Sequence, residues 1–245
     1  MCTVTFVAQQ RGYVLGMNRD EKLDRVSGLG PEERFIGEHR ALCPSEPGGG
    51  TWIGVNEAGV AFALINWYAI QSRASGLVLS RGGVVMACLA ASDRTTAEDA
   101  LGSLPLRRMN PFRMIAVFPK SLEVIEWRWD RERLAMESMG WRTWVWISSG
   151  LDEAGAQRER GLCFEQACQE RDSGSLDWLR RFHQSHRPER GPYSVCMHRA
   201  DAATVSYTEI GVEGDLATLR HSQGALCQCG AALSELQLAP VGNRA

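Results

Sequence analysis

The chain has 245 residues, of which 44% are hydrophobic and 23% charged, so it is long enough to bury a substantial core. Its formal net charge of −2 argues against the basic surface that nucleic acid or an anionic membrane requires, and we expect no nucleic-acid partner. No uninterrupted apolar run reaches membrane-spanning length, so the sequence predicts no membrane span. The length is within the range of one domain, and we predict a single domain over residues 1–245.

The chain contains eight cysteines, and the context in which they occur decides how they are interpreted. The first residues show neither a basic region nor an apolar stretch of the kind that directs export. We therefore expect a cytoplasmic protein whose cysteines are mostly free thiols.

The first part of the chain is predicted to form antiparallel hairpins. Residues 2–9 and 13–17 read as two strands around a turn, and the polar run 18–21 closes this hairpin. Residues 22–50 lack a clear period and contain several glycines and prolines, so we predict an irregular loop there. Strands at 51–55 and 60–65 form a second hairpin.

The rest of the chain is predicted to alternate between helices and strands. Residues 78–92 form a buried helix or strand, Thr95 to Glu98 begin a helix, and residues 153–185 are helical with a break near 172–174. Further strands are predicted at 114–118, 122–129, 133–139, 144–148, 193–197, 204–210 and 215–220. Antiparallel groups of strands at both ends, with helices between them, favour an α+β sandwich over a doubly wound parallel sheet.

Cys2 is the first candidate for chemistry, because removal of Met1 would expose it as the first residue. A thiol and an α-amine would then share one residue, and the amine, with an ordinary pKa of about 7.7–8.0, would act as the base for the thiol. The alternative is an ordinary thiol at the start of a strand.

The run Asn18-Arg19-Asp20-Glu21 is the second candidate, since hairpin geometry places it opposite the start of the first strand. Arg19 could stabilise a thiolate on Cys2, and Asp20 could hold its amine. The alternative is a solvated turn.

Asn66 is the third candidate, because it follows a glycine-rich stretch at 49–59 and an apolar strand. Its amide could donate a hydrogen bond to an oxyanion. The alternative is an asparagine that only bonds its own turn.

Taken together, these motifs resemble a known family. Met-Cys at the start, NRDE at 18–21, GGTWIGVNEAG at 49–59, Asn66, and the late stretch 194–206 are similar to the NRDE family, whose best-known eukaryotic member is the transport and Golgi organisation protein 2. That family is similar in turn to the choloylglycine hydrolase and penicillin V acylase branch of the N-terminal nucleophile hydrolases.

The resemblance implies a four-layer αββα fold and attack by the Cys2 thiolate on a linear amide in a small amide or acyl substrate. It implies that Arg19 stabilises the thiolate, that Asp20 holds the amine, and that Asn66 donates to the oxyanion. The hydrolases space their arginine and aspartate differently, so the role of Asp20 could belong to Glu21. By strand order, Arg199 matches a late active-site arginine.

Five further residues are candidates for binding the substrate. Ser148-Ser149 stands where many family members have Ser-Asn, which weakens the case for amide hydrolysis because a serine hydroxyl reaches less far than an amide. We place Ser149 at the substrate, with an apolar acyl pocket from Trp52, Trp67 and Tyr68, and with His198 close to the site.

We expect neither a metal nor a cofactor. The pairs Cys227/Cys229 and Cys163/Cys168 lack zinc-finger spacing, and His183 and His186 read as a solvated helix end. The eukaryotic relatives imply a second class of function, a non-catalytic trafficking or binding protein that handles haem or lipid. The sequence leaves both classes open.

Overall fold

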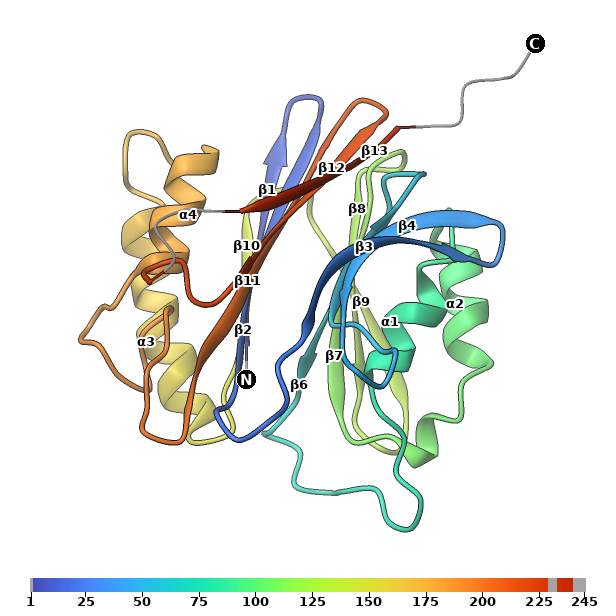
Figure 1. Cartoon of the computed structure of the whole chain (residues 1–245), viewed down its shortest axis with the longest axis horizontal. Helices are drawn as coiled ribbons and strands as arrows, with labels where there is room; N and C mark the ends of the chain where they lie inside the picture. Colours follow the sequence, from blue (N-terminus) through green and yellow to red (C-terminus); the bar gives the residue numbers. More distant parts are fainter. Residues whose placement is uncertain (1, 229–232, 240–245) are drawn as a thin grey trace.

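The computed structural model describes residues 2–228 and 233–239, which form two antiparallel sheets packed face to face (Figure 1). In this part of the chain the first sheet has six strands, in the spatial order β10 (Trp144–Ser148), β1 (Cys2–Gln9), β2 (Gly12–Lys22), β11 (Ala202–Glu213), β12 (Leu216–Gln223) and β13 (Ser234–Leu238). The second has seven, in the order β3 (Leu29–Ile36), β4 (His39–Ser45), β5 (Ile53–Asn56), β6 (Ala61–Asn66), β7 (Phe112–Phe118), β8 (Glu123–Trp129) and β9 (Leu134–Met139).

A pair of helices covers the outer face of each sheet (Figure 1). Helices α3 (Glu153–Ala167) and α4 (Leu176–Gln184) lie against the first sheet, and α1 (Gly82–Cys88) and α2 (Arg94–Gly102) lie against the second, followed by a short 3-10 turn at Leu106–Arg108. The layers therefore run helix, sheet, sheet, helix. The predicted α+β sandwich of antiparallel sheets is confirmed.

Three apolar clusters hold the layers together, because each sheet buries both of its faces. The largest lies between the sheets and contains Val4, Leu15 and Ile115. A second lies under α1 and α2, and a third joins Val7 to Trp178 and Phe182 of α4. Burial on this scale is the main favourable term in folding.

The structure differs from the predicted elements in three places. Residues 22–50 are not an irregular loop, because β3 and β4 lie there as an antiparallel pair. Residues 193–197 form no strand. Strand β2 continues through Lys22, so the NRDE run lies within a strand and does not close the hairpin.

Of the described residues, none belongs to a helix that is long and apolar enough to cross a bilayer.

Candidate functional site around Cys2

Cys2 begins strand β1, which lies between β10 and β2 in the first sheet. It pairs with Arg19 of β2 on one side and with Ser148 of β10 on the other. Its side chain faces the second sheet, since it packs with Val4 in the cluster between the sheets, and the residue is only 8% exposed. The predicted placement of the NRDE run opposite the start of the first strand is therefore confirmed.

Arg19 lies on the same face as Cys2 and is held by fixed partners. Its Nη2 donates to Glu46 Oε1 at 2.9 Å and to Glu21 Oε2 at 3.3 Å, and Arg25 contacts the same two carboxylates. The guanidinium carbon lies 4.5 Å from the centre of the Trp52 ring, a cation–π contact. These contacts hold a positive charge in one position between the sheets.

Asp20 points to the opposite face, because side chains alternate along a strand. Its carboxylate accepts from Arg160 Nη1 at 3.1 Å and from Thr204 Oγ1 at 2.7 Å, and both Asp20 and Arg160 are buried. Arg160 also donates to Thr3 Oγ1 at 2.8 Å. The β2–β11 register shifts between Thr204 and Ser206, a bulge of the kind common beside active sites.

Sequence reasoning missed Arg160, which lies in the middle of α3. An arginine within a polar helical pattern normally faces solvent, and only the packing of α3 on the first sheet brings this one to Asp20. No local signal in the sequence could have found it.

Cys2 opens into a cavity of about 310 Å³ between the two sheets. Arg19, Trp52 and Asn66 line it with Cys2, as does Arg81, which precedes α1 and was also missed. Arg25, Glu21 and Glu46 also line it, so the cavity combines a thiol, an amide donor, three guanidinium groups and carboxylates.

The donors in this cavity are already oriented. Asn66 Nδ2 donates to Tyr68 Oη at 2.8 Å, which uses one of its two amide hydrogens. Arg81 Nη1 donates to the Pro111 carbonyl at 3.0 Å, and burial lowers the pKa of Arg81. Each donor is thus positioned before any ligand enters.

The Cys2 thiol is not activated by these surroundings. Burial raises the pKa of Cys2, the Asp20 carboxylate raises it further, and the charge of Arg19 lowers it. Burial changes the pKa of Cys2 more than the charge of Arg19 does, so the thiol form is favoured at neutral pH.

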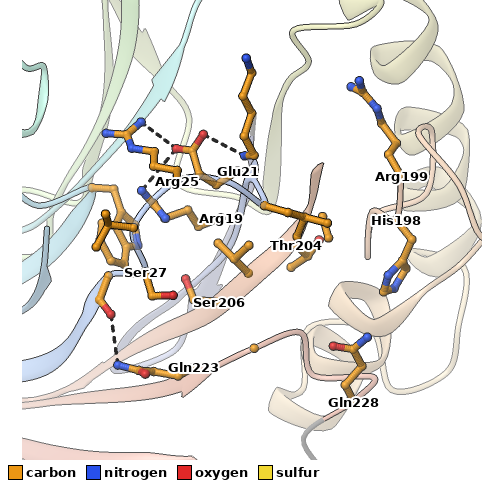
Figure 2. A pocket seen from close by; sticks show the side chains of 18 of the residues that line it. Arg19, Glu21, Arg25, Ser27, His198, Arg199, Thr204, Ser206, Gln223 and Gln228 are labelled. Atoms are coloured by element: carbon orange, nitrogen blue, oxygen red, sulfur yellow. Dashed lines mark hydrogen bonds and ion pairs between the residues drawn. The ribbon is translucent and has the colours of Figure 1, made fainter. Parts of the chain in front are cut away.

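A second cavity of about 480 Å³ shares one wall with the first (Figure 2). Arg19, Glu21, Arg25 and Trp52 line both cavities. Figure 2 shows these charged side chains at one end and two other predicted residues, Arg199 and His198, at the other.

Arg199 lines this second cavity and not the one that contains Cys2. Its Nη2 donates to Asp201 Oδ2 at 2.7 Å. Arg199 thus lies at the second cavity and does not line the cavity that contains Cys2.

The other predicted substrate residues lie around Asn66 and the end of β10. Trp67 and Tyr68 are half-buried and, like Ser149, line neither cavity. Tyr68 packs against Gly150, and Ser149 Oγ accepts from the Leu151 amide at 3.3 Å. Among the predicted aromatic residues, only Trp52 lines the cavity with Cys2.

The histidines differ most from the prediction. His183 is not at a solvated helix end, because it is fully buried and its Nε2 lies 3.1 Å from Thr5 Oγ1. His186 and His198 meet two cysteines, Cys196 and Cys227, in a compact group. Cys229 of the predicted pair lies outside the described residues.

Comparison with known proteins gives one family and one fold. Residues 1–141 match the family described as Transport and Golgi organisation 2. No curated protein sequence matches the chain.

Two solved structures show the same fold at low identity. The C2A mutant of the conjugated bile acid hydrolase from Clostridium perfringens is similar with a TM-score of 0.57 and 11% identity, over 95% of this chain and 92% of that one. Penicillin V acylase from Agrobacterium tumefaciens is similar with a TM-score of 0.52 and 11% identity, over 91% and 83%.

Proposed function

Because the chain belongs to the Transport and Golgi organisation 2 family and carries a cysteine opposite an arginine inside a cavity, we propose that it is a cysteine hydrolase of the N-terminal nucleophile type. Its substrate would be a small molecule with a linear amide bond. The observation that carries the proposal is the shared cavity of Cys2, Arg19 and Asn66. The names of the two structural neighbours denote a hydrolase and an acylase, in agreement with this reaction class.

In the proposed reaction, removal of Met1 gives Cys2 a free α-amine, which accepts the proton of the thiol. The thiolate forms a carbon–sulfur bond to the amide carbonyl, and the oxyanion accepts a hydrogen bond from the second Nδ2 hydrogen of Asn66. The carbon–nitrogen bond then breaks, and the ammonium of Cys2 protonates the leaving amine. Water hydrolyses the thioester and releases the acid and the enzyme.

The surroundings of Arg19 and Asp20 support the roles given to these two residues. Arg19, fixed over Trp52, stabilises the Cys2 thiolate. Asp20 is a positioning residue: it lies one residue beyond the partner of Cys2 in β2, next to the place where the new amine would be, and Arg160 and Thr204 orient its carboxylate. The side chain of Glu21 instead binds Arg19 and Arg25, which favours Asp20 over Glu21 for this role.

The proposed substrate has an apolar acyl part and a polar or anionic end. Trp52 and Leu64 offer apolar surface in the cavity, and Arg81 offers a cation at another part of its wall. Roles for Trp67, Tyr68, Ser149, His198 and Arg199 in substrate binding or catalysis stay predictions.

The test compares the activity of the chain when residues precede Cys2 with its activity when Cys2 is the N-terminal residue. A cleavable tag that leaves Cys2 at the N-terminus gives both forms, which are assayed on a panel of N-acyl amines. We expect turnover only after cleavage, none in Cys2→Ala, and a loss of about 10²- to 10³-fold in kcat for Asn66→Ala. Equal turnover in Cys2→Ala, with circular dichroism unchanged, would refute the mechanism.

Iodoacetamide labelling, read by peptide mass, tests activation of the thiol directly. Because burial raises the pKa of Cys2 in the uncleaved chain, we expect slow labelling there and faster labelling after cleavage. Cys168, a half-buried thiol away from Cys2, is the internal standard. If cleavage leaves the rate of Cys2 unchanged, the amine does not act as the base.

The raised pKa of Cys2 also favours a second candidate, a non-catalytic binding protein of the same fold that handles haem or lipid. In that case haem or acyl-CoA would bind saturably while no amide is turned over. Saturable binding that Cys2→Ala leaves intact, together with inactivity of the cleaved form, would favour this candidate.

The chemistry needs a reduced Cys2, so we assign the activity to the cytoplasm, where thiols stay reduced. Cell fractionation is the check, with the protein expected in the cytosolic fraction.

A further inference from the structure

Four potential metal ligands meet at one place, on the face of the first sheet that the helices cover. They are His186, just after α4, Cys196 and His198, ahead of β11, and Cys227, after β12. Each offers one ligand atom, and these atoms all lie within 4.8 Å of one another. The proposed hydrolysis uses none of them as a reacting group.

The spacing of these atoms is close to that of a tetrahedron around one ion. With Zn–S near 2.3 Å and Zn–N near 2.05 Å, a regular tetrahedron has edges of about 3.8 Å between sulfurs, 3.3 Å between nitrogens and 3.6 Å between the two kinds. The two Nε2 atoms lie 3.2 Å apart, and His198 Nε2 lies 3.5 Å and 3.4 Å from the sulfurs of Cys196 and Cys227. Among these four distances, only the one between the sulfurs, 3.3 Å, must change by as much as about 0.5 Å, and His186 Nε2 lies within 4.8 Å of both sulfurs.

The surroundings of the cluster also suit a divalent ion. Two thiolates neutralise a charge of +2, which matters because Cys196 is buried and both histidines are half-buried. Arg190 approaches Nδ1 of His198 at 3.4 Å, and a metal on Nε2 would leave the proton on Nδ1. Arg190 is exposed, so its side chain has room to turn away.

We propose that His186, Cys196, His198 and Cys227 bind one zinc-class divalent ion in a closed structural site. Two sulfurs and two imidazole nitrogens grouped around one point are a donor set that zinc prefers. Because four protein ligands fill the coordination sphere, the ion stabilises the structure and activates no water.

The ion would join three segments that lie outside the helices and strands: the one after α4, the one before β11 and the one after β12. Met197, between two of the ligands, donates its amide to Thr204 Oγ1 at 2.8 Å, and Thr204 donates to Asp20 at 2.7 Å. Asn18 Nδ2 donates to the Val195 carbonyl at 2.9 Å. The ion therefore supports the outer face of β2, on the side opposite Cys2, and this holds whether or not Cys2 is catalytic.

The first experiment measures metal content and geometry in the whole protein, purified under reducing conditions. We expect one zinc ion per chain by mass spectrometry of the metal. After replacement with Co²⁺, we expect the visible d–d bands of tetrahedral cobalt and a thiolate-to-cobalt charge-transfer band. Chelation should lower the Tm, and added zinc should restore it.

Variants test one cysteine and one histidine ligand against matched controls. Cys227→Ser and His186→Gln should lose the zinc and the cobalt spectrum, whereas Cys168→Ser and His39→Gln should keep both. His186→Cys should keep the metal and strengthen the charge-transfer band, since it adds a third thiolate. This gain of signal cannot arise from simple unfolding.

Three results would overturn the proposal. One is a folded wild-type protein that binds neither zinc nor cobalt under reducing conditions. Another is a metal content that Cys227→Ser and His186→Gln leave unchanged. The third is a Cys196–Cys227 disulfide, seen as a mass lower by two hydrogens, that persists under those conditions and excludes the ion.

Discussion

At the scale of single residues, the most consequential contact is the buried ion pair of Asp20 and Arg160. Both side chains are fully buried, and the pair joins β2 to α3. Arg160→Leu leaves the carboxylate without its cation, so we expect the free energy of unfolding to fall by about 3–5 kcal/mol. Chemical denaturation at neutral pH measures it.

Two controls make this prediction specific. Arg158→Leu removes an exposed arginine of the same helix and should change stability by less than about 0.5 kcal/mol. Asp20→Asn combined with Arg160→Leu should recover part of the loss, because no charge is then left unpaired. Fully additive costs would show that the two side chains do not act as a pair.

His183 makes stability depend on pH. Burial, helped by the charge of Arg160, lowers the pKa of His183 from 6.5 to about 3. Below pH 6.5 the unfolded chain therefore takes up a proton that the folded chain does not, and stability falls as the pH drops towards 3. At pH 5 the loss is about 2 kcal/mol.

Stability curves of His183→Gln and wild type, measured between pH 7 and 5, check this dependence. The variant should lose less stability over that range. His221, whose pKa burial lowers to about 4, is present in every chain and cancels in the comparison. Parallel curves for His183→Gln and wild type would contradict the prediction.

At the scale of elements, the start of helix α2 shows how closely a local capping signal predicts a helix boundary. The structure begins α2 at Arg94, with Asp93 as its cap, two residues before the predicted Thr95. Asp93 accepts from the Thr96 amide at 2.9 Å. We expect Asp93→Ala to cost about 1 kcal/mol, because the first turn loses a partner for its amide.

Thermal unfolding of Asp93→Ala beside Asp99→Ala, a change within the same helix, separates the cap from the loss of charge. Only the first should lower the Tm. A similar decrease in both variants would mean that the cap is unimportant.

Strands β3 and β4 show where element prediction fails. Most residues of β3 are exposed or half-buried, and the strand lies at the edge of the second sheet. An edge strand of this kind has no apolar alternation to reveal it, so Pro31 and the neighbouring glycines suggested a loop. Residues 29–36 form a strand because they pair with β4, and their own sequence gives no sign of it.

At the scale of the whole molecule, contacts between the two packed sheets contribute to stability. Tyr13 of β2 donates from its hydroxyl to the Gly59 carbonyl in the turn between β5 and β6, at 2.8 Å, in a buried position. Tyr13→Phe leaves this carbonyl unpaired, and we expect a loss of about 1–3 kcal/mol.

Tyr193→Phe is the matched control, since the Tyr193 hydroxyl donates to Asp152 at an exposed site. Its effect on denaturant unfolding should stay below about 0.5 kcal/mol. An equal cost in both variants would mean that the hydrogen bond between the sheets adds nothing to stability.

Three features could be predicted from the sequence alone: the antiparallel α+β sandwich, the family, and the position of Cys2 opposite Arg19. These follow from local rules: side chains alternate along strands, and a short turn sets the register of a hairpin. The pairing of Cys2 with Arg19 joins two residues only 17 positions apart in the sequence.

The distant side chains that complete the site could be identified only in the folded chain. Arg160 reaches Asp20 from 140 residues away, and Arg81 enters the cavity because α1 packs on the other sheet. Cys196 and Cys227 meet although 31 residues separate them. Such contacts depend on how whole layers pack, and the free energy of packing is a property of surfaces that no short stretch of sequence contains.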